Sequence, residues 1–60
     1  MSARFKAGDR VVYLSGDDAY LGTVTEAVFY IDTFLYACDW SDGFGDGRRM
    51  YPESNFRRVH

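Results

Sequence analysis

Short runs of β-branched and aromatic residues, separated by turns rich in glycine and aspartate, make up almost the whole of this 60-residue chain. Such runs are typical of β-strands, and glycine and aspartate favour the tight turns that join strands. A helix over residues 23–36 is disfavoured because that stretch is dominated by β-branched and aromatic residues and has no helical caps. The sequence therefore predicts an all-β protein.

Five strands are expected, all within a single domain that spans residues 1–60. Gly22 interrupts the second run and indicates either a bulge or a close backbone approach. Asp32 and Thr33 form a plausible two-residue hairpin connection, and the three glycines of residues 42–47 indicate a loop. Residues 52–55 are long enough for one 3₁₀ turn. The strands are predicted at Arg10–Leu14, Tyr20–Ile31, Phe34–Ser41, Arg48–Tyr51 and Phe56–Val59.

The aromatic content compensates for the small size of the domain. A chain of this length buries only about 60% of the surface that it exposes when unfolded, so a dense aromatic core or association would help it. Cys38 lies in the apolar alternation of a strand with Tyr36 and Trp40, and we expect it to be a small core residue rather than a reactive thiol. The eleven rings exceed what the interior needs. We expect exposed rings among Tyr13, Tyr20, Phe29, Tyr30, Phe34 and Phe44.

Charge is unevenly distributed along the chain. Residues 1–6 carry +2, residues 7–46 carry −7 and residues 47–60 carry +3. If the first and last strands lie side by side, Arg4 and Lys6 join Arg57 and Arg58 in one basic face. The net charge of −2 argues against strong non-specific binding to nucleic acid, which draws on many phosphate contacts. No apolar run approaches the roughly 20 residues of a membrane-spanning helix, so we expect a cytoplasmic protein with no membrane contact.

Four motifs occur in an order that resembles the Tudor and KOW class of SH3-like barrels. The resemblance covers nearly the whole chain and implies a five-stranded SH3-like barrel with a short 3₁₀ turn before the last strand. Because these motifs serve turns and the core, they indicate the fold better than the function. They are Gly8-Asp9-x-Val11, Gly22-x-Val24, Tyr36-x-Cys38-x-Trp40-x-Asp42-Gly43 and Phe56-x-x-Val59.

A second set of motifs is similar to the plasmid-encoded type II dihydrofolate reductases, which are homotetrameric SH3-like barrels with a central pore for NADPH and dihydrofolate. This similarity implies an NADPH-dependent oxidoreductase as an alternative function. Arg49 stands where that family has the glutamine that contacts both ligands, and Tyr13 stands where it has the lysine that attracts them. Four copies of Arg49 around one pore would repel one another. The motifs are Phe5-x-x-Gly8-Asp9-Arg10-Val11, Ser15-Gly16, Tyr20-x-Gly22-x-Val24, Arg48-Arg49-Met50-Tyr51-Pro52 and Arg58-Val59.

The surplus rings predict a ligand site. Tudor-like barrels gather rings and an acidic residue into a cage for a methylated cation, which cation–π attraction holds. The resemblance implies such a cage at Tyr20, Trp40 and Phe44, with Asp18 or Asp42 as the acid. In the alternative interpretation Trp40 belongs to the core and the other rings form a surface for self-association.

The arginines predict a second site. Arg48, Arg49, Arg57 and Arg58, with Tyr51 as a stacking ring, suit single-stranded nucleic acid. They could equally be solvated residues on edge strands that block sheet-to-sheet aggregation.

Other groups with possible chemistry have ordinary interpretations. His60 is the single histidine and is not part of a catalytic constellation, so no catalytic residue is predicted. The acidic residues Asp17, Asp18, Asp42 and Asp46 could meet around a cation, but turn conformation accounts for them as well, and we expect neither a metal nor a cofactor. The sequence as a whole favours a non-catalytic binding or assembly module that contacts a protein or peptide partner, copies of itself included.

Overall fold

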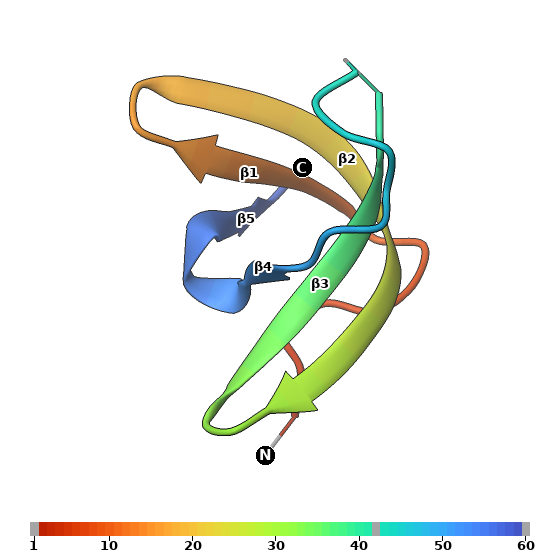
Figure 1. Cartoon of the computed structure of the whole chain (residues 1–60), viewed down its shortest axis with the longest axis vertical. Coiled ribbons are helices and arrows are strands. Elements are labelled where there is room, and N and C mark those ends of the chain that lie inside the picture. The colour runs from red at the N-terminus through yellow and green to blue at the C-terminus, as the bar shows by residue number, and fades with distance from the viewer. Residues whose placement is uncertain (1, 42, 60) are drawn as a thin grey trace.

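A computed structural model describes residues 2–41 and 43–59, and these residues form one five-stranded antiparallel sheet (Figure 1). The sheet curls into a half-barrel that is consistent with an SH3-like barrel, and the strand order is β4-β3-β2-β1-β5. This confirms the predicted all-β fold, including one short 3₁₀ turn before the last strand. No helix among the described residues is long and apolar enough to cross a membrane. The elements are β1 (Arg10–Ser15), β2 (Asp18–Tyr30), β3 (Thr33–Trp40), β4 (Tyr51–Pro52), η1 (Glu53–Asn55) and β5 (Phe56–Arg58).

The long strand β2 joins the two halves of the sheet. Its first part pairs with β1 from Ser15↔Asp18 to Arg10↔Thr23, and it pairs with β3 from Gly22↔Trp40 to Tyr30↔Thr33. A bulge between Val24 and Glu26 shifts the register with β3, and the hydroxyl of Thr25 donates to the Ala37 carbonyl at 3.2 Å. A bulge bends and twists its strand, which lets one strand serve both halves of a curled sheet.

Gly22 provides the close approach that was predicted, while the bulge lies three residues further along. A Cβ atom built at Gly22 would lie 2.8 Å from Cε3 of Trp40 and 3.1 Å from Cβ of Cys38. Real Cβ atoms do not come that close to a rigid ring. The sheet therefore closes over Trp40 only because position 22 has no side chain.

Several predicted strand boundaries differ from the observed ones by one to three residues, and two of these differences alter a loop or a turn. The fourth strand was expected at Arg48–Tyr51, but β4 holds only Tyr51 and Pro52, because Gly47 turns the chain at a φ of 84° and the Arg48 N–H donates to the Asp46 carboxylate at 3.0 Å. Such a local side-chain bond gives the backbone an alternative to the sheet. The second boundary concerns the hairpin turn, which is Ile31-Asp32 rather than Asp32-Thr33.

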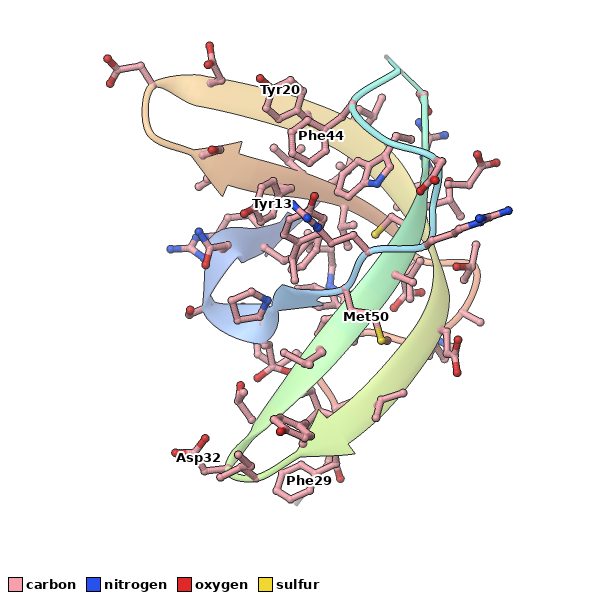
Figure 2. The ribbon with its side chains drawn as sticks, in the orientation of Figure 1. Tyr13, Tyr20, Phe29, Asp32, Phe44 and Met50 are labelled. Carbon is pink, nitrogen blue, oxygen red and sulfur yellow. The ribbon has the colours of Figure 1, made fainter. Side chains whose placement is uncertain are left out.

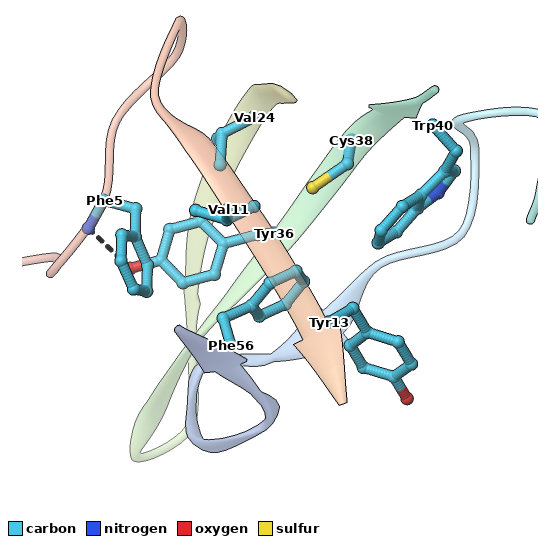
Figure 3. Packing of buried hydrophobic residues seen from close by; sticks show 8 residues of the cluster. All are labelled: Phe5, Val11, Tyr13, Val24, Tyr36, Cys38, Trp40 and Phe56. Atoms are coloured by element: carbon cyan, nitrogen blue, oxygen red, sulfur yellow. Dashed lines mark hydrogen bonds between the residues drawn. The ribbon is translucent and has the colours of Figure 1, made fainter. Parts of the chain in front are cut away.

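The core lies on the concave face of the half-barrel (Figure 3). Tyr36, Cys38 and Trp40 alternate inward along β3 as predicted, and Cys38 is fully buried. Burial raises the pKa of the Cys38 thiol to about 11, which keeps it protonated at neutral pH. The buried hydrophobic cluster consists of Phe5, Val11, Tyr13, Val24, Tyr36, Cys38, Trp40 and Phe56.

Tyr13 was expected among the exposed rings, but the structure shows that it is buried. It retains only 9% of its accessible surface, because it lies on the same face of β1 as Val11 and points into the half-barrel. Its ring packs against Tyr51 at 4.5 Å, Phe56 at 5.3 Å and Trp40 at 5.9 Å between centroids. Tyr13 is therefore the support on which neighbouring rings rest.

The hydroxyl of Tyr36 ties three segments together. It donates to Oε2 of Glu53 in η1 at 2.6 Å and accepts from the Phe5 N–H at 3.3 Å (Figure 3 shows the second bond). The same Glu53 oxygen accepts from the Arg4 N–H at 3.1 Å. Burial raises the pKa of Tyr36, and the hydrogen bond to Glu53 raises it further to a smaller extent. The network fastens the N-terminal segment and the 3₁₀ turn across the concave face.

Candidate binding groove

A shallow groove with a volume of about 640 Å³ opens beside the loop that joins β3 to β4. Two rings, Phe44 and Tyr51, are half-buried, and two arginines, Arg48 and Arg49, are exposed. We call this surface the groove. Its lining residues are Phe44, Gly45, Asp46, Arg48, Arg49 and Tyr51.

The core holds the two rings of the groove in place. Phe44 and Tyr51 lie 5.6 Å apart between centroids, and each packs on Tyr13, at 5.5 Å and 4.5 Å. Trp40 meets the Phe44 ring edge-on at 5.0 Å. Rings fixed in this way lose little conformational entropy when a ligand binds, so the groove is preorganised.

The arginines of the groove supply its positive charge. Among the residues that the structure describes, neither the Arg48 nor the Arg49 guanidinium has a hydrogen bond or an ion pair. One oxygen of the Asp46 carboxylate is engaged by the Arg48 N–H. Both guanidinium forks are thus available for an anionic ligand, for which their planar geometry suits carboxylate or phosphate.

The three rings of the predicted cage lie together, but Phe44 packs directly against both of the others. Tyr20 and Phe44 stack with centroids 4.0 Å apart, as Figure 2 shows, and Trp40 retains only 7% of its accessible surface. Rings in direct contact leave no gap for a cation between them. Asp18 is exposed at the start of β2, and Asp42, like His60, lies outside the described residues. The methylated-cation site stays a prediction, and the geometry favours a ligand on the side of the rings where Arg48 and Arg49 lie.

The structure divides the four predicted arginines into two groups. Arg48 and Arg49 line the groove with Tyr51, whereas Arg57 and Arg58 lie on β5. The Arg57 guanidinium donates to the backbone carbonyls of Ser54 and Phe56 at 3.0 Å and 2.8 Å. The last strand's arginines are therefore engaged within the chain.

The first and last segments do form a basic face, but without Arg57. The guanidinium carbons of Arg4 and Arg58 lie 5.2 Å and 5.3 Å from the centroid of the Phe5 ring. Arg58 donates to the Arg4 carbonyl at 2.9 Å, and both Arg58 and Lys6 are 3.5 Å from Asp9 oxygens. A hydrogen bond from the Lys6 N–H, aided by the charges of Lys6 and Arg58, lowers the pKa of Asp9. Asp9 neutralises part of the positive charge of this face, so we expect the face to bind an anion more weakly than the groove does.

A second surface lies at the tip of the β2–β3 hairpin, where the sequence predicted exposed rings but did not predict that they form one continuous apolar patch. Phe29 and Tyr30 are exposed, as predicted, and Phe34 packs edge-on against Phe29 at 5.0 Å. The neighbours Val28 and Ile31 are exposed too. The signal was present in the sequence, since an exposed run of four apolar residues is unusual in a soluble protein.

The acidic residues do not assemble into a metal site within the described part of the chain, where no group of three or more His, Cys, Asp or Glu side chains is close enough to hold an ion.

No protein-family model, no curated protein and no solved structure matches this chain. The similarity to Tudor and KOW barrels and to type II dihydrofolate reductases therefore depends on the motifs quoted above. In the reductase comparison, the position of the ligand-attracting lysine is the buried ring of Tyr13 and the position of the glutamine is the exposed Arg49.

Proposed function

We propose that this domain is a non-catalytic binding module that takes an acidic segment of a protein partner in the groove. The observation that supports this function is the presence, in one open groove, of two half-buried rings and two guanidinium groups that have no partner among the described residues. Guanidinium forks pair with carboxylates, and the Phe44 and Tyr51 rings accept an apolar or aromatic side chain of the same segment.

The open shape of the groove suits an extended peptide better than a small molecule. Pockets for small ligands usually enclose most of the ligand, whereas this groove is shallow and open. A charge-assisted hydrogen bond contributes about 1.5–3 kcal/mol to binding. Two such bonds and one apolar anchor stabilise the complex, and the free-energy cost of association offsets part of this gain. We expect dissociation constants on the order of 10–100 μM.

The test is isothermal titration calorimetry of the full chain with a 12-residue peptide that carries four glutamates around one tryptophan. Arg49→Gln should weaken binding roughly tenfold, because about 1.4 kcal/mol of contact is lost. Arg57→Gln is the matched control: it makes the same substitution, removes the same charge and lies outside the groove, so its effect should stay within about twofold. Equal weakening by the two variants would show that net charge rather than the groove is recognised, and absence of binding at millimolar peptide would reject the function.

A second candidate, single-stranded nucleic acid, is favoured by the presence of the Tyr51 and Phe44 rings, 5.6 Å apart between centroids, in the same groove as the two arginines. Titration with a labelled oligothymidylate at two salt concentrations distinguishes the two ligands. Binding of the oligonucleotide tighter than that of the acidic peptide, with affinity that falls as salt rises, would assign the groove to nucleic acid instead.

A further inference from the structure

The tip of the β2–β3 hairpin presents apolar side chains that nothing in the described chain covers. Figure 2 places Phe29 at the end of this hairpin, away from Phe44 of the groove. Four consecutive residues retain large exposed fractions: Val28 37%, Phe29 49%, Tyr30 59% and Ile31 77%. An exposed apolar patch of this kind usually marks an interface.

Along one edge of β2 in the same region, no described strand pairs with it. The strand β1 pairs with β2 only as far as Thr23, and the Asp9 carbonyl accepts from the Val24 N–H at 2.9 Å. From Glu26 to Tyr30, within residues 2–41 and 43–59, β2 pairs with β3 alone. We call residues 26–30 the free edge. It has no lysine and no proline, the residues with which natural proteins commonly block such edges.

The hairpin turn fixes which backbone groups point outward from the free edge. In a two-residue hairpin the closing pair, here Tyr30↔Thr33, is hydrogen-bonded, and hydrogen-bonded pairs then alternate along the ladder. Glu26, Val28 and Tyr30 thus direct their N–H and C=O groups to β3. Ala27 and Phe29 direct theirs away from the sheet, where they can pair with another strand.

We propose that the free edge pairs antiparallel with the free edge of a second copy of this chain, about a twofold axis at Val28. Val28 then faces Val28 of the second copy, and Ala27 faces Phe29 of the second copy as a hydrogen-bonded pair. The two such pairs supply four backbone hydrogen bonds, and the two hairpins become one four-stranded surface. This assembly is independent of what the groove binds.

Charge selects this register over its neighbour. The only charged residues of the hairpin between Thr25 and Leu35 are Glu26 and Asp32, both acidic. With the axis at Val28, the two Glu26 side chains are four residues apart, about 13 Å at 3.3 Å per residue, which exceeds the Debye length in physiological salt. Each Glu26 then lies opposite Tyr30 of the second copy, whose hydroxyl can donate to the carboxylate. With the axis at Ala27 the two carboxylates would be only about 7 Å apart and would repel each other.

A second copy is a better occupant than an anionic membrane, which the two acidic residues would repel. The area also agrees with a reversible dimer. A ring buries about 150–250 Å², so the half-exposed Phe29 and Tyr30 of both copies contribute on the order of 400 Å², and the backbone and Val28 add to this. The total stays at the low end of specific interfaces, which predicts dissociation in the micromolar range.

Sedimentation velocity of the full chain between about 1 and 500 μM tests the dimer. The wild-type mass should rise from the monomer's 6.9 kDa toward twice that value as concentration increases. Val28→Lys places two ammonium groups at the axis and should keep the chain monomeric throughout. Val59→Lys is the matched control, since Val59 is also 37% exposed and lies on another surface, and it should dimerise like wild type. A wild type that stays monomeric, or two variants that dimerise equally, would overturn the proposal.

Amide hydrogen exchange followed by NMR tests the free edge without any variant, in case Val28→Lys does not fold. The Ala27 and Phe29 amides should gain at least tenfold protection between about 10 and 500 μM protein, whereas the Val28 amide, bonded to β3, should change little. A dimer that forms without protecting Ala27 and Phe29 would show that the hairpins pack face to face, which contradicts edge pairing.

Discussion

Gly22→Ala examines the close contact on which the curled sheet depends. The new methyl carbon would lie 2.8 Å from Cε3 and 3.1 Å from Cζ3 of Trp40, and 3.1 Å from Cβ of Cys38. Trp40 cannot move aside freely, because it meets Tyr13, Phe44 and Phe56 at centroid distances of 5.9, 5.0 and 6.4 Å. The substitution therefore adds volume to a core that has no room for it.

The size of the effect follows from two opposing contributions. An extra methyl group in a packed core costs about 1–3 kcal/mol, while replacing glycine by alanine in a strand returns about 0.5–1 kcal/mol of backbone entropy. We expect a net loss of about 1–2 kcal/mol in the free energy of unfolding. At about 4–8 °C per kcal/mol for a domain of this size, the melting temperature should fall by about 5–15 °C.

Gly45→Ala is the matched control, because a Cβ atom there would also face Trp40 but at 3.5 Å from Cδ1, an ordinary contact, and its φ is not positive. Thermal unfolding followed by circular dichroism should show Gly45→Ala within about 0.5 kcal/mol of wild type. The single tryptophan allows a second measurement, since a displaced indole changes the emission of the folded Gly22→Ala protein. Equal melting temperatures for the two variants, with unchanged emission, would refute the packing argument.

Two further predictions concern Tyr36 and its neighbour Cys38. Tyr36→Phe removes the hydroxyl that bonds to Glu53 and Phe5, and urea unfolding should show a loss of about 1–2 kcal/mol in the free energy of unfolding. Tyr30→Phe removes the hydroxyl of an exposed ring and should leave this free energy unchanged. Equal urea midpoints for the two variants would contradict the hydrogen-bond network. The free energy of unfolding should also fall as pH rises from 9 toward 11. The Cys38 thiol has a pKa of about 11 in the folded state and 9.0 in the unfolded state, so the unfolded state loses this proton first. The raised pKa of Tyr36 acts in the same direction. Cys38→Ala should be less stable at neutral pH but should lose less between pH 9 and 11, and an unchanged slope would rule out the thiol as the cause.

The inward alternation of β3 could be predicted from the sequence because it follows the two-residue period of a strand. The close approach at Gly22 could be predicted because a glycine within a strand is typical of such an approach. The burial of Tyr13 could not. Periodicity assigns a side chain to a face but does not say how many rings fit there. Tyr13 packs edge-on against Trp40 and at a tilt against Phe56, which lets a small interior hold more rings than a simple volume estimate allows. The short fourth strand was missed because the Asp46–Arg48 bond competes with the sheet.

The sequence also could not predict which of the four arginines the fold would engage. Four arginines with similar neighbours in the chain differ only in what the fold brings to them. Pairing of β5 with β1 places Arg58 beside Asp9 and Arg4, while the loop before β4 leaves Arg49 without a partner among the described residues. Long-range register decides which cations remain available to a ligand, and register follows from the packed fold rather than from local composition.

The groove and the free edge lie apart along the molecule, which makes the two proposals physically compatible. Figure 2 shows Phe44 in the upper half and Phe29 at the lower end of the longest axis, whose extent is 30 Å. A dimer through the free edge would thus leave both grooves open. A partner with two acidic segments would then bind the second groove at a high effective concentration, and linked binding of this kind exceeds single-site affinity by about 10²–10⁴-fold. Weak binding in one groove is therefore sufficient for a tight complex, provided that dimerisation occurs at the working concentration.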